Sequence, residues 1–220
     1  MRVSDTARAA RFAVADATDP ALWHKARAAL HDDPDPRVRA AALGAVVRAA
    51  TAAARTVDDT TEHALELWRS TTADPDRTVR RRAAELAPSV PHVVPGPLLE
   101  LLTDPDPLVA EAAAWALGEV AWEPPGANEV VRALATATVT HGDPLVREAA
   151  VAALGALGDP AGVDAVLSAC RDRPAIRRRA VLALAPFEGP AVEAALAEAL
   201  ADPDWQVRQA AEDLRSAGDP

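Results

Sequence analysis

The sequence predicts an all-α protein, a right-handed α-solenoid of about six helical hairpins with a capping helix at its N-terminal end. Three observations predict this fold. One segment recurs six times along the 220 residues, alanine supplies 55 of them, and no stretch alternates apolar and polar residues as a half-buried strand does. Because tyrosine is absent and only two phenylalanines occur, Ala, Leu and Val must fill the core, which suits helices packed at close range.

The recurring segment has the apolar spacing of one helix face. Its six copies span residues 33–44, 74–87, 104–118, 142–155, 172–185 and 202–214. Each copy contains a β-branched anchor residue: Val38, Val79, Val109, Val146, Ile176 and Val207. The residue four places after each anchor is alanine: Ala42, Ala83, Ala113, Ala150, Ala180 and Ala211. With a further apolar residue seven or eight places after most anchors, this spacing predicts a helix in every copy.

Each of these helices has a recognisable beginning. In five copies an aspartate lies three residues before the anchor, where its carboxylate can accept hydrogen bonds from the first backbone N–H groups: Asp35, Asp76, Asp106, Asp143 and Asp204. In four copies the next residue is a proline, at a position where a missing N–H costs nothing: Pro36, Pro107, Pro144 and Pro174. The sequence therefore predicts where the second helix of each hairpin starts.

Apolar segments between the copies supply the first helix of each hairpin. They span residues 20–30, 59–71, 97–103, 127–140, 160–170 and 190–200. Residues 4–16 form one more predicted helix, which we expect to cover the apolar side of the first hairpin, because an end repeat otherwise exposes the surface that internal repeats bury. The predicted organisation is an N-terminal cap over residues 1–18, followed by one continuous repeat domain over residues 19–220.

The repeated pattern D-P-D-x-x-V-R-x-x-A-A-x-A-L-G resembles the short HEAT-like repeats of the phycobilin-lyase type, and it covers nearly the whole chain. Proteins of this family are scaffolds, adaptors, lyase subunits and a few enzymes. The resemblance implies a non-catalytic interaction or scaffolding module that binds a protein or peptide partner. The alternative that it implies is an enzyme or enzyme subunit, similar to a chromophore lyase subunit or a DNA-repair glycosylase.

The net charge, the single cysteine and the lack of long apolar segments limit which partners and which cellular compartment we expect. The formal charge of −10 disfavours a nucleic-acid partner, because such binding depends on Lys and Arg to neutralise phosphates. The single cysteine, Cys170, excludes an intramolecular disulfide. No segment has the roughly 18 apolar residues of a membrane helix, and the N-terminal residues lack the apolar stretch of a signal peptide. We expect a monomeric bacterial protein of the cytoplasm that contacts no membrane.

Residues that could carry catalysis or hold a metal form no recognisable motif. The five histidines have no metal-ligand spacing. The sequence contains no Ser/His/Asp arrangement, no Gly-rich phosphate loop and no cysteine in a nucleophile context. We expect no cofactor, no metal and no catalytic residue.

Arginine follows the anchor directly in five copies, as Arg39, Arg80, Arg147, Arg177 and Arg208, and Ala110 takes this place in the third copy. An aspartate four residues earlier predicts an ion pair within the helix for four of these arginines, for example Asp143 with Arg147. The arginine runs at 80–82 and 177–179 are open to two interpretations. They could recognise phosphate or carboxylate groups, or they could be solvated and paired with neighbouring acids.

The second and sixth residues after each anchor are expected to face a concave groove, because the anchor and the residues four and eight places after it point inward. From these positions we predict a binding surface for a protein or peptide: Arg81, Glu85, Glu111, Trp115, Glu148, Ala152, Arg178 and Leu182. Trp115 is the expected apolar centre of that surface, within a charged rim. The alternative is that Trp115 folds over the following repeat and packs beneath the loop that contains Trp122.

Overall fold

The computed structural model describes residues 20–53 and 59–218, and over these ranges the chain forms twelve α-helices, two short 3-10 helices and no strand. The prediction of an all-α fold is confirmed. The predicted capping segment over residues 1–18 lies outside the described residues.

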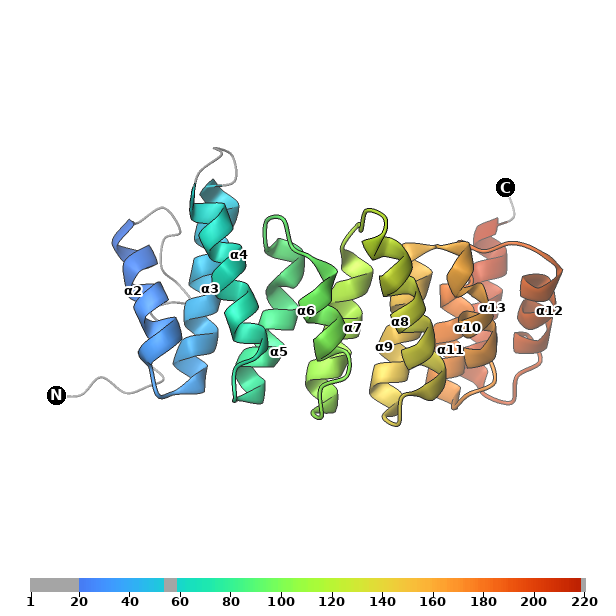
Figure 1. The fold of residues 1–220 in the computed structure, drawn as a ribbon. Coiled ribbons are helices and arrows are strands. Elements are labelled where there is room, and N and C mark those ends of the chain that lie inside the picture. Colours follow the sequence, from blue (N-terminus) through green and yellow to red (C-terminus); the bar gives the residue numbers. More distant parts are fainter. Residues whose placement is uncertain (1–19, 54–58, 219–220) are drawn as a thin grey trace. The chain divides into compact units, whose positions relative to one another are not determined.

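First and second helices alternate along the chain as a series of hairpins (Figure 1). The first helices are α2 (Pro20–Asp32), α4 (Asp59–Thr72), α6 (Pro95–Leu101), α8 (Gly126–Thr140), α10 (Val163–Ala169) and α12 (Pro190–Ala199). The second helices are α3 (Pro36–Ala53), α5 (Arg77–Leu86), α7 (Pro107–Glu119), α9 (Pro144–Leu157), α11 (Pro174–Ala183) and α13 (Trp205–Gly218). The 3-10 helices η1 (Ala87–Ser89) and η2 (Pro160–Gly162) lie in the connections, and every predicted helix of the described ranges is present.

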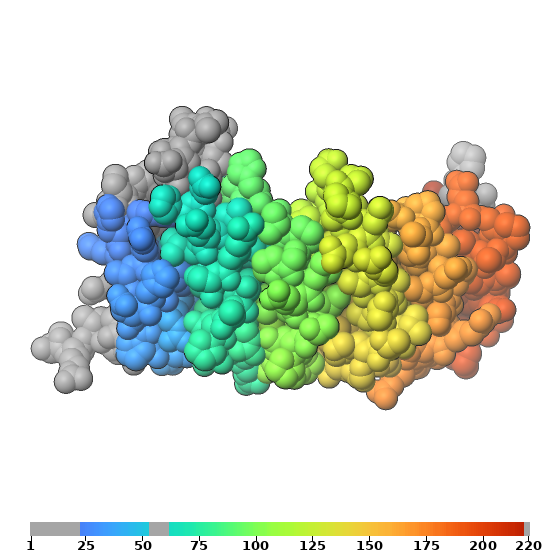
Figure 2. Space-filling model, in the orientation of Figure 1, coloured from blue at the N-terminus to red at the C-terminus, as the bar shows by residue number. Residues whose placement is uncertain are grey.

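The helices divide into two compact units, Met1–Val109 and Ala110–Pro220. In the first unit the second helices α3 and α5 contact each other, as do the first helices α4 and α6. In the second unit α9 contacts α11 and α11 contacts α13, while α10 contacts both α8 and α12. Each unit is thus a two-layered stack of hairpins, and the hairpins of the second unit lie as adjacent bands from yellow to red in Figure 2. A single continuous solenoid over residues 19–220 stays a prediction.

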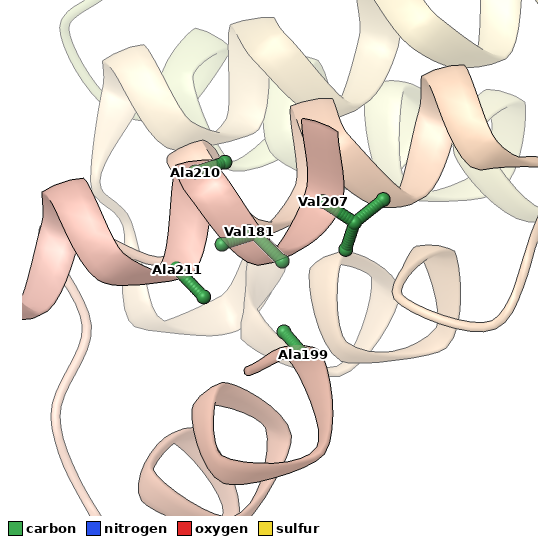
Figure 3. Close-up of a cluster of buried hydrophobic side chains, with 5 residues drawn as sticks. All are labelled: Val181, Ala199, Val207, Ala210 and Ala211. Atoms are coloured by element: carbon green, nitrogen blue, oxygen red, sulfur yellow. The ribbon is translucent and has the colours of Figure 1, made fainter. Parts of the chain in front are cut away.

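The anchors and their alanines form the core, as predicted. All twelve of these residues are at most 1% exposed, from Val38 and Ala42 in α3 to Val207 and Ala211 in α13. At the end of the second unit, one apolar cluster joins three helices (Figure 3): Val181 from α11, Ala199 from α12, and Val207, Ala210 and Ala211 from α13. Because no single hairpin buries a sufficient core, this packing between neighbours supplies most of the stability.

The helix beginnings also follow the prediction. The side chains of all five predicted N-cap aspartates accept a hydrogen bond from the backbone N–H two residues later, at 2.7 to 3.0 Å. In α11 the capping position is Arg173, whose side chain makes no such bond. Asp and Pro at the turns therefore fix the start of each second helix in register with its anchor.

Small residues let the second helices approach closely within the second unit. A Cβ atom placed on Gly118 of α7 would lie 2.7 Å from Cα of Ala153 in α9, and one on Gly155 of α9 would lie 2.6 Å from Cα of Ala183 in α11. Real Cβ atoms do not come this near to a backbone carbon. Both glycines are thus required by helix packing at these contacts.

Candidate functional site

In four of the five copies that carry it, the arginine that follows an anchor reaches into the next hairpin. Nε and Nη2 of Arg147 donate to the two carboxylate oxygens of Asp172 at 2.7 and 3.0 Å. The same pair of hydrogen bonds joins Arg39 to Asp74, Arg80 to Asp104 and Arg177 to Asp202. We call this bidentate ion pair the arginine clamp. The prediction of ion pairs within the helices is wrong, because each N-cap aspartate bonds to the backbone. Arg39, Arg80 and Arg147 instead bond to an aspartate of the next hairpin. Arg208, in the last copy, donates to the carbonyl oxygens of Asp202 and Pro203 in its own turn.

Each clamp also ties the arginine to its own turn. Nη1 of Arg147 donates to the carbonyl oxygens of His141 and Gly142 at 2.9 and 3.3 Å. The hydrogen bond from Arg147 holds the pKa of Asp172 below its ordinary value, and that from Arg177 does the same for Asp202. The guanidinium groups of the clamps therefore bond within the protein, and they are not available to bind a row of anions along the stack.

The clamp is missing between α7 and α9. Ala110 stands where the arginine would be, and His141 stands where the other turns carry the aspartate. Nδ1 of His141 accepts a hydrogen bond from the backbone N–H of Asp143 at 3.1 Å. The imidazole therefore bonds within its own turn and takes no part in a clamp. Both partners of the clamp are thus replaced at the same junction.

A pocket of about 420 Å³ lies at this junction. The α7 wall carries Glu111, Trp115 and Glu119, and the α9 wall carries Leu145, Glu148 and several alanines that include Ala152. Arg179 of α11 completes the lining. The indole of Trp115 is 48% exposed, which excludes the alternative in which this side chain is buried beneath the Trp122 loop. We call this cavity the α7–α9 pocket.

The structure brings four of the eight predicted binding residues together in this pocket: Glu111, Trp115, Glu148 and Ala152. Glu111 and Trp115 lie one turn apart on α7, and Glu148 and Ala152 lie one turn apart on α9. Half of the predicted binding residues therefore line one pocket within the second unit, and the binding itself stays a prediction.

The other four predicted residues lie elsewhere. Arg81 and Glu85 belong to the first unit and form an ion pair with each other at 3.0 Å. Leu182 is exposed and Arg178 is half-buried on α11, but neither lines the α7–α9 pocket. Of the arginine runs, Arg82 pairs with Glu85 and Arg179 with Glu148, as the interpretation of paired arginines predicts.

Sequence reasoning missed six side chains of the pocket: Glu119, Leu145, Arg179 and the three alanines Ala149, Ala153 and Ala156. Helical spacing along α9 could have identified Leu145 as a residue of the pocket. The α9 lining follows the spacing i, i+3, i+4, i+7 from Leu145, so the exposed face begins one residue before the anchor Val146. Arg179 reaches the pocket from the next hairpin, which no pattern within one helix indicates.

A second hollow, of about 650 Å³, lies between the first helices α8 and α10. Its walls include Val131, Val139, Arg132 and Asp164, and no aromatic side chain is among its lining residues. A large exposed aromatic side chain is the feature that marks interface centres, and only the α7–α9 pocket of these two hollows has one.

Two further properties concern the described residues only. Within ranges 20–53 and 59–218, no group of three or more His, Cys, Asp or Glu side chains is arranged to hold a metal ion. None of the helices in the described part of the chain is long and apolar enough to cross a membrane.

Cys170, at the C-terminal end of α10, is expected to react slowly with thiol reagents. Burial raises the pKa of its thiol from 9.0 to about 11, so the thiolate fraction at neutral pH falls about 100-fold. The rate of reaction with iodoacetamide should rise with pH up to about 11, and it should be fast at neutral pH in urea, where the burial is lost. A fast reaction of the folded protein at pH 7 would contradict this prediction.

Three comparisons with known proteins bear on this architecture. A search of the curated proteins found no match. Among solved structures, the chain is similar to an engineered protein, with 23% identity, 88% of this chain and 97% of that chain covered, and a TM-score of 0.62. It is also similar to YibA of E. coli, with 15% identity, 98% and 71% coverage, and a TM-score of 0.65. A designed armadillo repeat protein in complex with the peptide (KR)4 shares 15% identity, with 89% and 98% coverage and a TM-score of 0.58.

These similarities show the fold of stacked helical repeats. The family model of HEAT repeats matches residues 65–138, 94–185 and 131–215, which together cover more than half of the chain. The match is to HEAT repeats in general and does not distinguish the phycobilin-lyase type. The recurring anchors, the stacked hairpins and this match agree, and the chain belongs to the HEAT repeat family.

Proposed function

We propose that the chain is a non-catalytic binding module that holds a peptide or protein segment on the second helices of its second unit, at the α7–α9 pocket. The observation that carries this proposal is the half-exposed indole of Trp115 in the wall of that pocket. A tryptophan in a partly enclosed site gives a large contact area at a small entropic cost, which is why interface centres are rich in this residue.

The surroundings of Trp115 support the proposal. Leu145, which is 48% exposed, and the alanines of α9 add apolar surface, while three glutamates and Arg179 provide a charged rim. An apolar centre within a charged rim is typical of protein interfaces. Repeat proteins with a similar fold include one solved in complex with a peptide, which supports the same class of ligand.

The test is a selection of random displayed peptides on the immobilised full chain, followed by affinity measurements on two matched variants. Trp115→Ala removes the proposed centre, and Trp205→Ala removes a tryptophan that is 64% exposed on α13 of the same unit. We expect Trp115→Ala to weaken the binding of selected peptides at least about 10-fold, as loss of an interface hot spot does, and Trp205→Ala to change it less than about 2-fold.

Circular dichroism should show unchanged helical content for both variants, because both side chains are exposed. Equal binding of the selected peptides to Trp115→Ala and to the unaltered chain would contradict the proposed site.

A further inference from the structure

The α7–α9 pocket carries an excess of negative charge, and this charge indicates what enters it. We propose that the pocket receives the guanidinium group of an arginine side chain from a basic segment of the partner. This inference rests on the proposed function, and it adds the chemical class of the bound side chain.

The α7 wall places two carboxylates around the tryptophan. Glu111 lies four residues before Trp115 and Glu119 four residues after it, so all three side chains share one face of the helix, one turn apart. In the part of the chain that the structure describes, no side chain forms an ion pair with Glu111 or Glu119. The indole thus lies between two carboxylates that have no internal counter-charge.

The opposite wall of the pocket is lined mostly by small side chains. On α9 the lining residues Ala149, Ala152 and Ala156 are small, and Glu148 contributes a third carboxylate. The pocket of about 420 Å³ thus has an indole on one wall, small side chains on the other, and carboxylates on both helices.

Arg179 is the single cation of the pocket lining. Its Nε lies 3.6 Å from Oε1 of Glu148, a distance at which it balances that charge without a hydrogen bond. Three glutamates and one arginine leave the pocket with a net charge of −2. An anion in this pocket would meet the unbalanced carboxylates of Glu111 and Glu119, whereas a cation would compensate them.

The charge of the whole second unit has the same sign. Residues 110–220 contain 17 acidic residues, nine arginines and no lysine, a formal net charge of −8. A field of this sign attracts basic segments and speeds their association, and it repels nucleic acids and acidic peptides.

A guanidinium suits this geometry better than an ammonium. It is planar and weakly hydrated, so it stacks on an indole face, and its edge donates several hydrogen bonds in one plane. Carboxylates on both sides of the ring can accept those bonds. An ammonium group would keep the charge attraction and lose the stacking.

The experiment measures fluorescence anisotropy of labelled, blocked Gly-Ser peptides that carry Arg, Lys or Gln at the same positions, with the full chain. We expect the Arg peptide to bind at least about 3-fold more tightly than the Lys peptide, because only the former stacks on Trp115, and the Gln peptide to bind below detection. Equal affinity for the Arg and Lys peptides, or no binding of the Arg peptide, would overturn the inference.

A matched pair of variants separates the pocket from the general charge of the protein. Glu111→Gln with Glu119→Gln removes two charges from the pocket, and Glu193→Gln with Glu212→Gln removes two exposed charges from α12 and α13, outside the pocket. We expect the first pair to weaken binding of the Arg peptide about 10-fold or more, and the second pair to weaken it less than about 2-fold. Equal losses in both pairs would show non-specific attraction and would overturn the inference.

The inference and the proposed function fail in different ways. If selected peptides lack arginine but still lose affinity for Trp115→Ala, the arginine inference is wrong and the binding site stands. If basic, neutral and acidic peptides all bind Trp115→Ala with the same affinity as they bind the unaltered chain, the proposed function is wrong as well.

Discussion

Replacing Arg147 with methionine is expected to lower the free energy of unfolding by about 2 kcal/mol, between the values typical of exposed and buried ion pairs. The side chains of Arg147 and Asp172 are only 13% and 22% exposed. Methionine keeps much of the volume of the side chain, but it removes the guanidinium donors of the carbonyl of His141 and of the Asp172 carboxylate, which keeps only the backbone N–H of Arg173.

Urea unfolding followed by circular dichroism measures this effect. The control is Arg171→Met, which removes an exposed arginine from the turn that follows α10 of the same unit and should change the stability by less than about 0.5 kcal/mol. Equal effects of the two substitutions would mean that the clamp contributes nothing beyond surface charge.

The clamp also predicts how stability depends on pH. The pKa of Asp172 is lowered in the folded protein by the hydrogen bond from Arg147, so the resulting stability is fully present above the ordinary value of 3.8 and is lost as pH falls through the lower folded value. The difference in unfolding free energy between the unaltered chain and Arg147→Met should therefore be constant above about pH 5 and shrink below about pH 4. A difference that grows with acidity would contradict this assignment.

Replacing Gly155 with valine is expected to cost about 3 kcal/mol of stability, at the upper end of the usual overpacking range. The new Cβ would lie 2.6 Å from Cα of Ala183 and 2.7 Å from its Cβ, so α9 and α11 must separate. The same substitution at Gly142, where nothing lies within 4 Å of a new Cβ, is the matched control and should change the stability by less than about 1 kcal/mol. If both variants unfold at the same urea concentration, α9 and α11 do not pack as closely as described.

Most of the fold could be predicted from the sequence because the same local sequence pattern recurs in six copies. An aspartate caps the helix in five copies, the anchor and an alanine four residues later face inward in all six, and each of these features is local in sequence. Trp68 of α4 packs in the core between the hairpin's two helices, and its Nε1 donates to the carbonyl of Ala83 of α5 at 2.8 Å.

The errors arise where a side chain reaches beyond its own helix. The sequence separation favours Asp143 as the partner of Arg147, but the stack brings Asp172 of the following hairpin within 2.7 Å. For the same reason Arg179 enters the α7–α9 pocket while its neighbour Arg178 does not. Helical periodicity determines the face on which a residue lies, and the stacking of hairpins determines what that face meets.

A partner held in the proposed α7–α9 site would contact Trp115, and the five tryptophans of the chain provide a direct measurement of that contact. Indole N–H signals in a nitrogen–proton correlation spectrum can be assigned by replacing Trp115 and Trp205 in turn with phenylalanine. On titration with a selected peptide, we predict that the Trp115 signal shifts while the signal of Trp205, which is also exposed, stays in place. A bound peptide that moves the Trp205 signal and leaves the Trp115 signal unchanged would contradict the proposed binding site at Trp115.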